Sequence, residues 1–359
     1  MSFSEVLERE IASVNKALEN FLDTKITRGK MLYPVHEEYY SNLKEYLMRG
    51  GKRFRPIAVV IGCKVVGGDI DHECLYTAAC SFEILHNASL VHDDLIDHDA
   101  TRRGGPTFHT RYSDLYKTSV LDDAEKAFHF GMTCAILGGD SLINMGAMAI
   151  TEANLDPDIG MKCMNYYHRG FEDIIEGVFL EMNMVNMDNV TPEMYLKMIE
   201  LKTAALLEKS LLMGGAIGRA SESQMKALSE YGLKIGQAFQ IQDDILGSFG
   251  DTKVTGKAAD GDIKEGKKTM LLLGVLHLGT PEQKEILGRY IGNEKITPDE
   301  VEKVRDIFRE SGALEYARNI MTDLLVEGQK ALDKAEPPLV DRYKQYMLDL
   351  SNFLVKRDY

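Results

Sequence analysis

The 359-residue sequence predicts an all-α protein, and three observations carry that prediction. One helix-start signature recurs three times, at Thr191-Pro192, Thr280-Pro281 and Thr297-Pro298, each followed by an acidic residue. It combines a hydroxyl N-cap, a proline at the first helical position and an acid near the positive end of the helix dipole. The chain has nine prolines, and clear two-residue alternation bounded by hairpin turns is missing.

The N-terminal half supports the same fold class. Ser2 and Glu5 have the spacing of a capping box, and apolar residues follow at helical periods, at Val6, Ile11, Val14, Leu18 and Leu22. The run from 56 to 66 could also be a strand, but its initial proline and its length favour a buried helix. Repeats, low-complexity tracts and Pro/Ser-rich linkers are missing, so we expect one domain over residues 1–359.

Composition excludes some function classes. The formal charge is −14, from 42 basic and 56 acidic residues, which argues against a broad surface for nucleic acid or anionic lipid. Five cysteines without a Cys-x-x-Cys pair indicate free thiols in a reducing cytoplasm. The start of the chain lacks the features of a signal peptide, and no stretch approaches 18 consecutive apolar residues. We therefore expect a cytoplasmic protein without nucleic-acid partners or stable membrane insertion.

The most informative segment is the acidic motif at 93–97. At about 100° per residue, Asp93, Asp97 and His86 share one helix face. Two carboxylates one turn apart can chelate Mg²⁺ and still leave coordination positions for phosphate oxygens. A solvated acidic face is the alternative, but the flanking residues are strongly apolar. The motif therefore predicts a metal site for a diphosphate substrate.

A second acidic pair, Asp243-Asp244, lies in the C-terminal half. Gln240 precedes Asp244 by four residues, so an amide and a carboxylate should face the same way. The mixed-charge stretch that follows includes Lys257 and Lys267, and it could close over a metal-bound diphosphate. In isolation, a charged surface loop explains this stretch equally well.

Two basic segments flank the first acidic motif. Arg102-Arg103 lies in a glycine-rich turn, and arginine forks bind phosphate oxygens bidentately. Gly50-Gly51 is followed by three cations, Lys52, Arg53 and Arg55, just before a helix start that favours anions. The spacing is not that of a Walker loop. Alone each would be a polar loop, but beside a metal site they predict a diphosphate clamp.

In this order the segments resemble the trans-prenyltransferases, the all-α isoprenyl diphosphate synthases. The resemblance covers nearly the whole chain and rests on the segments 50–56, 86–97, 102–104, 139–140, 202–203, 239–244 and 256–267. It implies a single large helical bundle with a central substrate cavity and a likeness to geranylgeranyl diphosphate synthases. It also implies a homodimer that uses Mg²⁺, three ions per active site with substrate bound.

The family pattern also implies roles for individual residues. The diphosphate of isopentenyl diphosphate would bind Lys52, Arg55, His86 and Arg103. Mg²⁺ would bind Asp93, Asp97 and Asp243, with Asp94, Asp244 and Asp251 as further ligands or support. The allylic diphosphate would bind Arg102, Lys202, Thr203, Gln240, Lys257 and Lys267. Catalysis would rest on oxygens that stabilise an allylic carbocation, from the Lys202 carbonyl, Thr203 and Gln240.

The implied reaction is head-to-tail (1'-4) condensation of isopentenyl diphosphate with an allylic diphosphate, giving an all-trans prenyl diphosphate and pyrophosphate. Two departures from the family pattern stand out. Gly247 occupies the position of a third aspartate, so metal binding there would rest on Asp243 and Asp244. The stretch from Tyr112 to Phe130 is longer than usual, and we expect a surface insertion near 112–130.

Product length should depend on side chains one, two and three helical turns before Asp93, because one turn of about 5.4 Å matches roughly one isoprene unit. These chain-length residues are Ala88 with Ser89, then Leu85, then Phe82. Farnesyl-producing relatives carry an aromatic residue at the first of these levels. Its absence here favours geranylgeranyl diphosphate.

Three alternatives remain open. A longer-chain polyprenyl diphosphate synthase would also carry small residues at the first level. A class I terpene cyclase would share the fold and the first acidic motif, but it would not need the Lys52 and Arg55 loop or the second aspartate pair. A non-catalytic synthase subunit would typically lose the acidic motifs, and both are present here.

Overall fold

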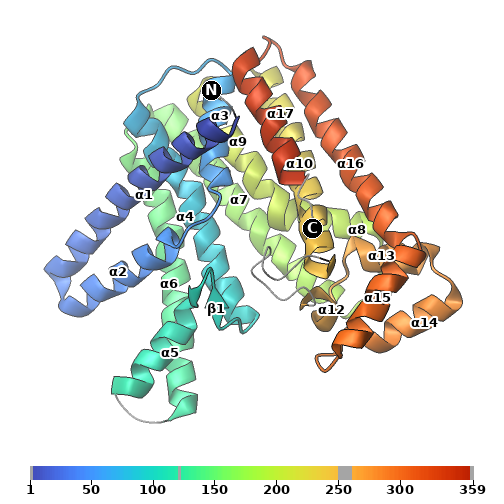
Figure 1. Cartoon of the computed structure of the whole chain (residues 1–359). Coiled ribbons are helices and arrows are strands. Elements are labelled where there is room, and N and C mark those ends of the chain that lie inside the picture. Colours follow the sequence, from blue (N-terminus) through green and yellow to red (C-terminus); the bar gives the residue numbers. More distant parts are fainter. Residues whose placement is uncertain (1–2, 120–122, 250–260, 356–359) are drawn as a thin grey trace. The chain divides into compact units, whose positions relative to one another are not determined.

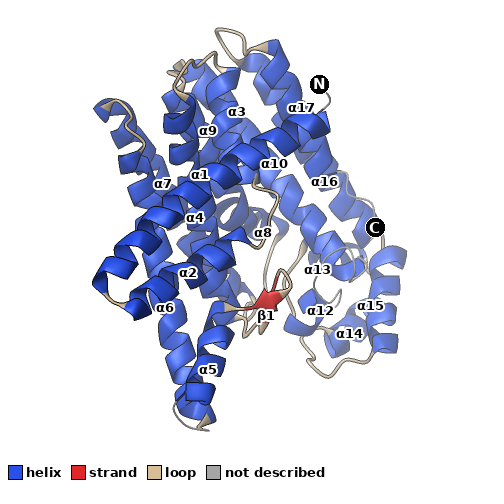
Figure 2. Ribbon diagram, turned by 60° about the vertical axis from the view of Figure 1, so that its left-hand side comes forward, coloured by secondary structure: helices blue, strands red, loops and turns tan. Residues whose placement is uncertain are grey.

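A computed structural model describes residues 3–119, 123–249 and 261–355, and nearly all of its regular structure is helical (Figures 1 and 2). The all-α prediction is confirmed. The described residues contain a single antiparallel strand pair, β1 (Thr101–Arg102) with β2 (Gly105–Pro106). The glycine-rich turn thus closes as a short hairpin. Apolar–polar alternation along the sequence could not predict it, because a strand of two residues is too short to show alternation.

The chain divides into two compact units, and each is described by itself. Unit 1 comprises Met1–Lys64, Gly68–Tyr167 and Met213–Arg219, and unit 2 comprises Val65–Gly67, His168–Leu212 and Ala220–Tyr359. The single domain over 1–359 and its central cavity stay predictions.

Unit 1 is built on paired helices, with α1 and α2 forming an antiparallel hairpin (Figure 1). Its helices are α1 (Phe3–Leu32), α2 (Pro34–Met48), α3 (Phe54–Val65), α4 (His72–Ile96), α5 (Phe108–Ser119), α6 (Ala124–Glu152) and the first part of α7 (Pro157–Met184). Its core combines buried side chains of α1, α2, α4, α5 and α6, among them Leu18, Leu43, Ile84, Phe108 and Leu142.

Local sequence explains where the helices of unit 1 begin and end. The opening amphipathic helix is present as α1, whereas Ser2 of the expected capping box lies outside the described residues. The segment starting near Pro56 is helical in α3, as predicted. Helix α4 begins at the N-cap Asp71, whose side chain accepts from the backbone N–H of Glu73 (2.8 Å). It ends at Ile96, where the chain turns toward the hairpin.

Unit 2 contains the rest of α7 and the C-terminal helices. These are α8 (Pro192–Ile199), α9 (Ala205–Ile217, to Leu212), α10 (Glu222–Phe249), α12 (Gly261–Glu265), α13 (Met270–Leu278), α14 (Pro281–Tyr290), α15 (Pro298–Glu310), α16 (Ala313–Ala331) and α17 (Asp341–Val355), with a 3₁₀ turn at Leu332–Lys334. All three Thr-Pro signals start helices, and Thr280 and Thr297 form full capping boxes.

A π-helical turn, Glu200–Ala204, joins α8 to α9 and carries Lys202 and Thr203. π-turns occur frequently at functional sites because they redirect side chains within a helix. Two glycines let neighbouring helices approach it closely. A Cβ on Gly177 of α7 would lie 2.3 Å from the Lys202 backbone nitrogen, and one on Gly236 of α10 would lie 2.4 Å from the Ala204 Cα.

The stretch expected as an insertion, 112–130, belongs to the end of α5 and the start of α6, with residues 120–122 outside the described part. The rings of Tyr112 and Tyr116 pack on Phe130, with centroids 6.3 and 5.3 Å apart. Its nature as an insertion stays a prediction.

Among the described residues, α6 is long and apolar enough by length and composition to cross a membrane. An 18-residue window can thus be apolar enough on average to cross a membrane even though no stretch of that length is uninterruptedly apolar. Core helices of soluble proteins pass it as well, and a single such helix is weak evidence.

Candidate active site

The first acidic motif separates two kinds of carboxylate. Asp93 is partly exposed, and Asp97, one turn later, is exposed beyond the last residue of α4. Asp94 is completely buried, and it accepts hydrogen bonds from the Tyr46 hydroxyl (2.7 Å) and from Nε of Arg102. Protein donors thus engage Asp94, whereas Asp93 and Asp97 are the more exposed carboxylates of the motif.

Arg102, predicted to bind the allylic diphosphate, contacts two carboxylates, and its role as a ligand stays a prediction. Besides Asp94, its Nη2 contacts Asp99 at 3.3 Å. Burial raises the pKa of Asp94, and the nearby Arg102 guanidinium and Tyr46 hydroxyl oppose that shift. The arginine therefore balances the charge of a buried carboxylate.

Arg103 joins the hairpin to the basic loop before α3. Its Nη1 donates to the Gly50 carbonyl (2.8 Å) and lies 3.5 Å from Oδ1 of Asn87. A Cβ on Gly51 would lie 3.3 Å from the Arg103 guanidinium, and Gly51 also has a φ of +130°, which side chains rarely adopt. Glycine at this position thus permits the arginine to lie against the loop.

One of the three cations in that loop has a structural role. Arg53 is 2% exposed, and its guanidinium donates to Oε1 of Glu83 on α4 (2.5 Å) and to the Leu47 carbonyl (2.9 Å). Glu83 also accepts from Nδ2 of Asn87 (3.1 Å). This buried ion pair fixes the loop to α4, and the roles of Lys52 and Arg55 as diphosphate ligands stay predictions.

His86 lies in cationic surroundings. Burial lowers its pKa well below the usual value, and the guanidinium groups of Arg55 and Arg103 lower the pKa further. A neutral imidazole among guanidinium groups is the electrostatic arrangement of an anion site. Unit 1 therefore brings Arg55, His86 and Arg103 together, and Lys52 lies in the loop just before α3, whose first turn contains Arg55.

In unit 2 the second acidic pair belongs to a chain of hydrogen bonds. The Tyr195 hydroxyl donates to Oδ2 of Asp244 (2.6 Å), and Nε2 of Gln240 donates to Oδ1 (2.8 Å). The Thr203 hydroxyl donates to Oε1 of Gln240 (2.7 Å). The expectation that Gln240 and Asp244 face the same way is confirmed, and Thr203 joins them.

The space beside Gly247 is already occupied by a carboxylate. A Cβ on Gly247 would lie 2.7 Å from Oδ2 of Asp262. Burial and the nearby charge of Asp262 raise the pKa of Asp244 to about 7. Asp262 thus places a carboxylate next to the position where the family pattern has its third aspartate. In the sequence this residue is only one member of a mixed-charge stretch.

Two predicted lysine ligands of unit 2, Lys202 and Lys267, are paired with acids. The Lys202 ammonium contacts Glu181, and Nζ of Lys267 lies 3.4 Å from Asp262 and 3.1 Å from Glu265. Although burial opposes it, the charges of Asp262 and Glu265 raise the pKa of Lys267. The predicted residues Lys257 and Asp251 lie outside the described residues.

The four chain-length residues differ in exposure. Phe82, Leu85 and Ala88 are completely buried, whereas Ser89 is partly exposed. Ala88 packs in the unit 1 core, and the Phe82 ring lies 6.1 Å from the Tyr167 ring. Their role in product length stays a prediction.

Sequence reasoning missed Tyr46, Tyr195, Glu83, Asn87 and Asp262. Tyr46 is 48 positions from Asp94 and Tyr195 is 49 from Asp244, so no spacing rule connects them. A partial signal existed for Asn87 and Glu83, because they lie on α4 one and two turns before the acidic motif. The sequence showed that Gly247 replaces the third aspartate of the family pattern, but it did not show that Asp262 fills the space beside it.

The fold is helical, and each acidic pair lies near basic side chains: arginines in unit 1, and Lys202 and Lys267 in unit 2. These features define a class of protein, the helical enzymes that act on diphosphate esters. The family model for polyprenyl synthetases matches residues 36–308. The chain is 38% identical to a geranylgeranyl diphosphate synthase of Saccharolobus solfataricus, covering 79% of this chain and 80% of that protein. It is 32% identical to a geranylfarnesyl diphosphate synthase of Aeropyrum pernix, covering 86% and 91%.

Among solved structures, a geranylgeranyl pyrophosphate synthase from Corynebacterium glutamicum, complexed with isoprenyl diphosphate and magnesium, matches with a TM-score of 0.90 at 27% identity over 100% of both chains. The chain belongs to the polyprenyl synthetase family. It is a trans-prenyltransferase that elongates prenyl chains, as the resemblance implied.

Proposed function

We propose that this enzyme condenses isopentenyl diphosphate with an allylic diphosphate to give all-trans geranylgeranyl diphosphate and pyrophosphate. The observation that carries the proposal is that each unit has its own cations for a diphosphate. In unit 1, Arg55 and Arg103 surround a neutral His86, and in unit 2, Lys202 and Lys267 accompany Asp244. Relatives named for geranylgeranyl diphosphate support the product.

The donor set fits Mg²⁺, which prefers hard oxygen ligands. Asp93 and Asp97, one turn apart and accessible at the end of α4, would hold it in unit 1, and Asp243 in unit 2. Within the described residues no group of three or more His, Cys, Asp or Glu side chains forms a ready metal site, so substrate oxygens would complete the coordination. We propose three ions per active site with substrate bound. When bound, Mg²⁺ offsets the charge that develops on the leaving diphosphate.

The residues of the chain would act as follows. Arg55, His86 and Arg103, with Lys52, hold the diphosphate of isopentenyl diphosphate, while Lys202 and Lys267 hold the allylic diphosphate, joined by Lys257 and Arg102. The allylic C–O bond breaks, and its electron pair leaves with pyrophosphate. Oxygens of Thr203, Gln240 and the Lys202 carbonyl stabilise the carbocation without attacking it.

The double bond of isopentenyl diphosphate then forms the new C–C bond, and a proton passes from the resulting cation to the released pyrophosphate. This sequence requires no side-chain nucleophile and no covalent enzyme intermediate. It needs only cations, oriented oxygens and the exclusion of water.

Product length is the most specific part of the proposal, and it can be tested directly. Purified protein incubated with farnesyl diphosphate, isopentenyl diphosphate and Mg²⁺ should give a dominant C20 product by chromatography. A dominant C25 or longer product would support the runner-up, a longer-chain synthase, which the geranylfarnesyl relative favours. A dominant C15 product would contradict both. Product formation without isopentenyl diphosphate would indicate a terpene cyclase, and activity only with an added polypeptide would indicate a non-catalytic subunit.

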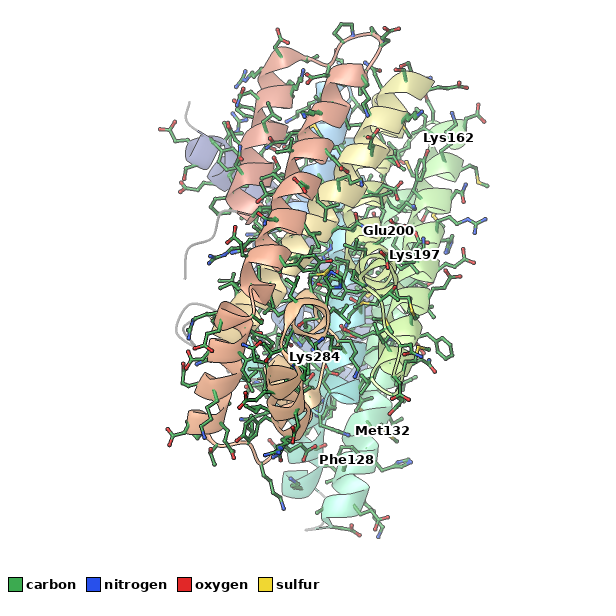
Figure 3. All side chains as sticks on the ribbon, turned by 90° about the vertical axis from the view of Figure 1, so that its right-hand side faces the viewer. Phe128, Met132, Lys162, Lys197, Glu200 and Lys284 are labelled. Atoms are coloured by element: carbon green, nitrogen blue, oxygen red, sulfur yellow. The ribbon has the colours of Figure 1, made fainter. Side chains whose placement is uncertain are left out.

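We also propose a cytoplasmic homodimer. Helix α6 exposes Phe128 (43%), Ile136 (44%) and Leu137 (55%), and Met132 lies one turn from Phe128 (Figure 3). Phe128, Met132 and Ile136 follow one another every four residues along one helix face, and a contiguous apolar stripe of this kind can mark a protein contact. Analytical ultracentrifugation should show a dimer, and Leu137→Asp should shift it toward monomer. A monomer at micromolar concentration would contradict the proposal. The five free thiols support the cytoplasmic location.

A further inference from the structure

Four polar side chains of unit 2 form a chain of hydrogen bonds with a fixed direction. It runs from Tyr195 on α8 through Asp244 and Gln240 on α10 to Thr203 in the π-helical turn. The three links measure 2.6, 2.8 and 2.7 Å. Each is of ordinary hydrogen-bond length, so the chain is continuous.

Donor and acceptor chemistry fixes the direction of every link. The ionised carboxylate of Asp244 accepts only, so Gln240 turns its amide NH₂ toward it, as the 2.8 Å contact shows. The amide carbonyl then faces Thr203, and because a carbonyl also only accepts, the Thr203 hydroxyl must donate its proton to Gln240. The proton of Thr203 is thereby committed to Gln240, and its oxygen lone pairs are left for other partners.

We propose that Tyr195 and Asp244 are positioning residues that orient Gln240 and Thr203 so that oxygen lone pairs, and not the hydroxyl proton, face the allylic carbocation. The inference rests on the proposed function, in which Thr203 and Gln240 lie beside that cation. A hydroxyl with its proton turned toward a developing positive charge would destabilise it, whereas the same hydroxyl with its lone pairs turned inward stabilises it.

Tyr195 is suited to hold the start of this chain. It is 1% exposed, and it lies in the first turn of α8, where Thr191 caps the helix by accepting from the Met194 N–H at 3.3 Å. Its hydroxyl fixes Oδ2 of Asp244 while Gln240 bonds Oδ1. Without that hydroxyl, the carboxylate can rotate about its side-chain bonds, and the amide that depends on it loses its fixed orientation.

The test removes one hydroxyl and compares it with a matched control. Tyr195→Phe breaks the chain at its origin. Tyr231→Phe is the control, because the Tyr231 hydroxyl is also buried in unit 2 and donates to the Met347 carbonyl (2.6 Å), outside the chain. Calorimetry with Mg²⁺ and pyrophosphate would measure binding of two allylic analogues of equal shape, one with an ammonium nitrogen at the cationic carbon and one neutral.

Wild type and Tyr231→Phe should prefer the ammonium analogue. Tyr195→Phe should lose roughly tenfold of that preference, as expected for one hydrogen bond, with affinity for the neutral analogue unchanged. If both affinities fall together, the role is merely structural and the inference is wrong. An unchanged preference, or no preference in wild type, would also overturn it.

If circular dichroism shows that Tyr195→Phe does not fold, Asp244→Asn takes its place. The carboxamide can donate to Gln240, which would reverse the amide and turn the Thr203 proton outward, so the preference for the ammonium analogue should disappear. A preserved preference would overturn the inference. Chain elongation by wild type is assayed separately, so failure of the proposed function would be seen there and not in the analogue ratio.

Discussion

In unit 1 the second aspartate of its pair, Asp94, is buried between a tyrosine hydroxyl and an arginine. In unit 2 the corresponding Asp244 is held by a tyrosine hydroxyl and a glutamine amide. Both pairs therefore use a tyrosine to fix the second carboxylate. They differ in the second partner. The Arg102 guanidinium neutralises the charge of Asp94, whereas the Gln240 amide, oriented by Asp244, in turn fixes the direction of the Thr203 hydroxyl.

The two regions also differ in their surrounding charge. Burial and the surrounding arginines lower the pKa of His86, so its surroundings in unit 1 are positively charged. Burial and the nearby charge of Asp262 raise the pKa of Asp244 to about 7. The charge around the second aspartate thus differs between the two units, and the following predictions test this contrast.

The largest effect is expected from the first aspartate of each pair. Asp93→Ala and Asp243→Ala should each lower kcat by about 10²–10³-fold, the scale of losing one electrostatic contributor to the transition state. Helicity by circular dichroism should not change. Asp114→Ala, an exposed carboxylate on α5, serves as the control. Near-normal turnover in either active-site variant would contradict the proposed function.

Arg103→Gln should separate the two substrates. Loss of a charge-assisted contact costs about 1.5–3 kcal/mol, so KM for isopentenyl diphosphate should rise about 10- to 100-fold while KM for the allylic substrate stays constant. Arg111→Gln is the matched control, because Arg111 pairs with Glu45 and not with the loop at Gly50. An equal rise in both KM values would show that Arg103 is not specific to one diphosphate.

The raised pKa of Asp244 predicts a pH dependence of Mg²⁺ binding. Below pH 7 this carboxyl is mostly protonated and no longer adds its negative charge beside Asp243, so Mg²⁺ affinity should weaken as pH falls through 7. Between pH 8 and 6 the loss should be about tenfold, from the change in the ionised fraction. Calorimetric titration of Mg²⁺ with pyrophosphate measures it. The same slope in Asp244→Asn would assign the dependence to another group.

Tyr46→Phe tests whether the tyrosine of unit 1 has the same role as that of unit 2. It leaves an oxygen of the buried Asp94 without its donor, which should lower the free energy of unfolding by about 1–3 kcal/mol. Urea unfolding measures this, and a double-mutant cycle with Asp94→Asn isolates the pair. Selectivity for an ammonium analogue should not change, because Arg102, not an amide, is the other partner.

The smallest effect concerns Gly247. Gly247→Asp restores the third aspartate of the family pattern, yet it should weaken Mg²⁺–pyrophosphate binding a few-fold, because Asp262 already lies 2.7 Å from the position of a Cβ there. Gly247→Asp combined with Asp262→Gly should restore the wild-type affinity. Tighter binding in the single variant would show that the space is free.

Local features of this protein were predictable. The three Thr-Pro helix starts, the helix at Pro56 and the shared orientation of Gln240 and Asp244 depend on residues a few positions apart, and the structure confirms them. The role of Arg53 was not predictable. It has the same sequence context as Lys52 and Arg55, but its partner Glu83 is 30 positions away.

By itself, the sequence determined the fold class, the family and the composition of the two acidic segments, because helical periods, caps and motif spacing are local properties of the chain. Only the tertiary structure decided which side chains hold Asp94 and Asp244. Tyr46 and Tyr195 reach Asp94 and Asp244 through helix packing, and Asp262 enters the space left by Gly247. Such contacts depend on which helices pack together and how closely, and residues tens of positions apart in the sequence show no pattern that reveals this.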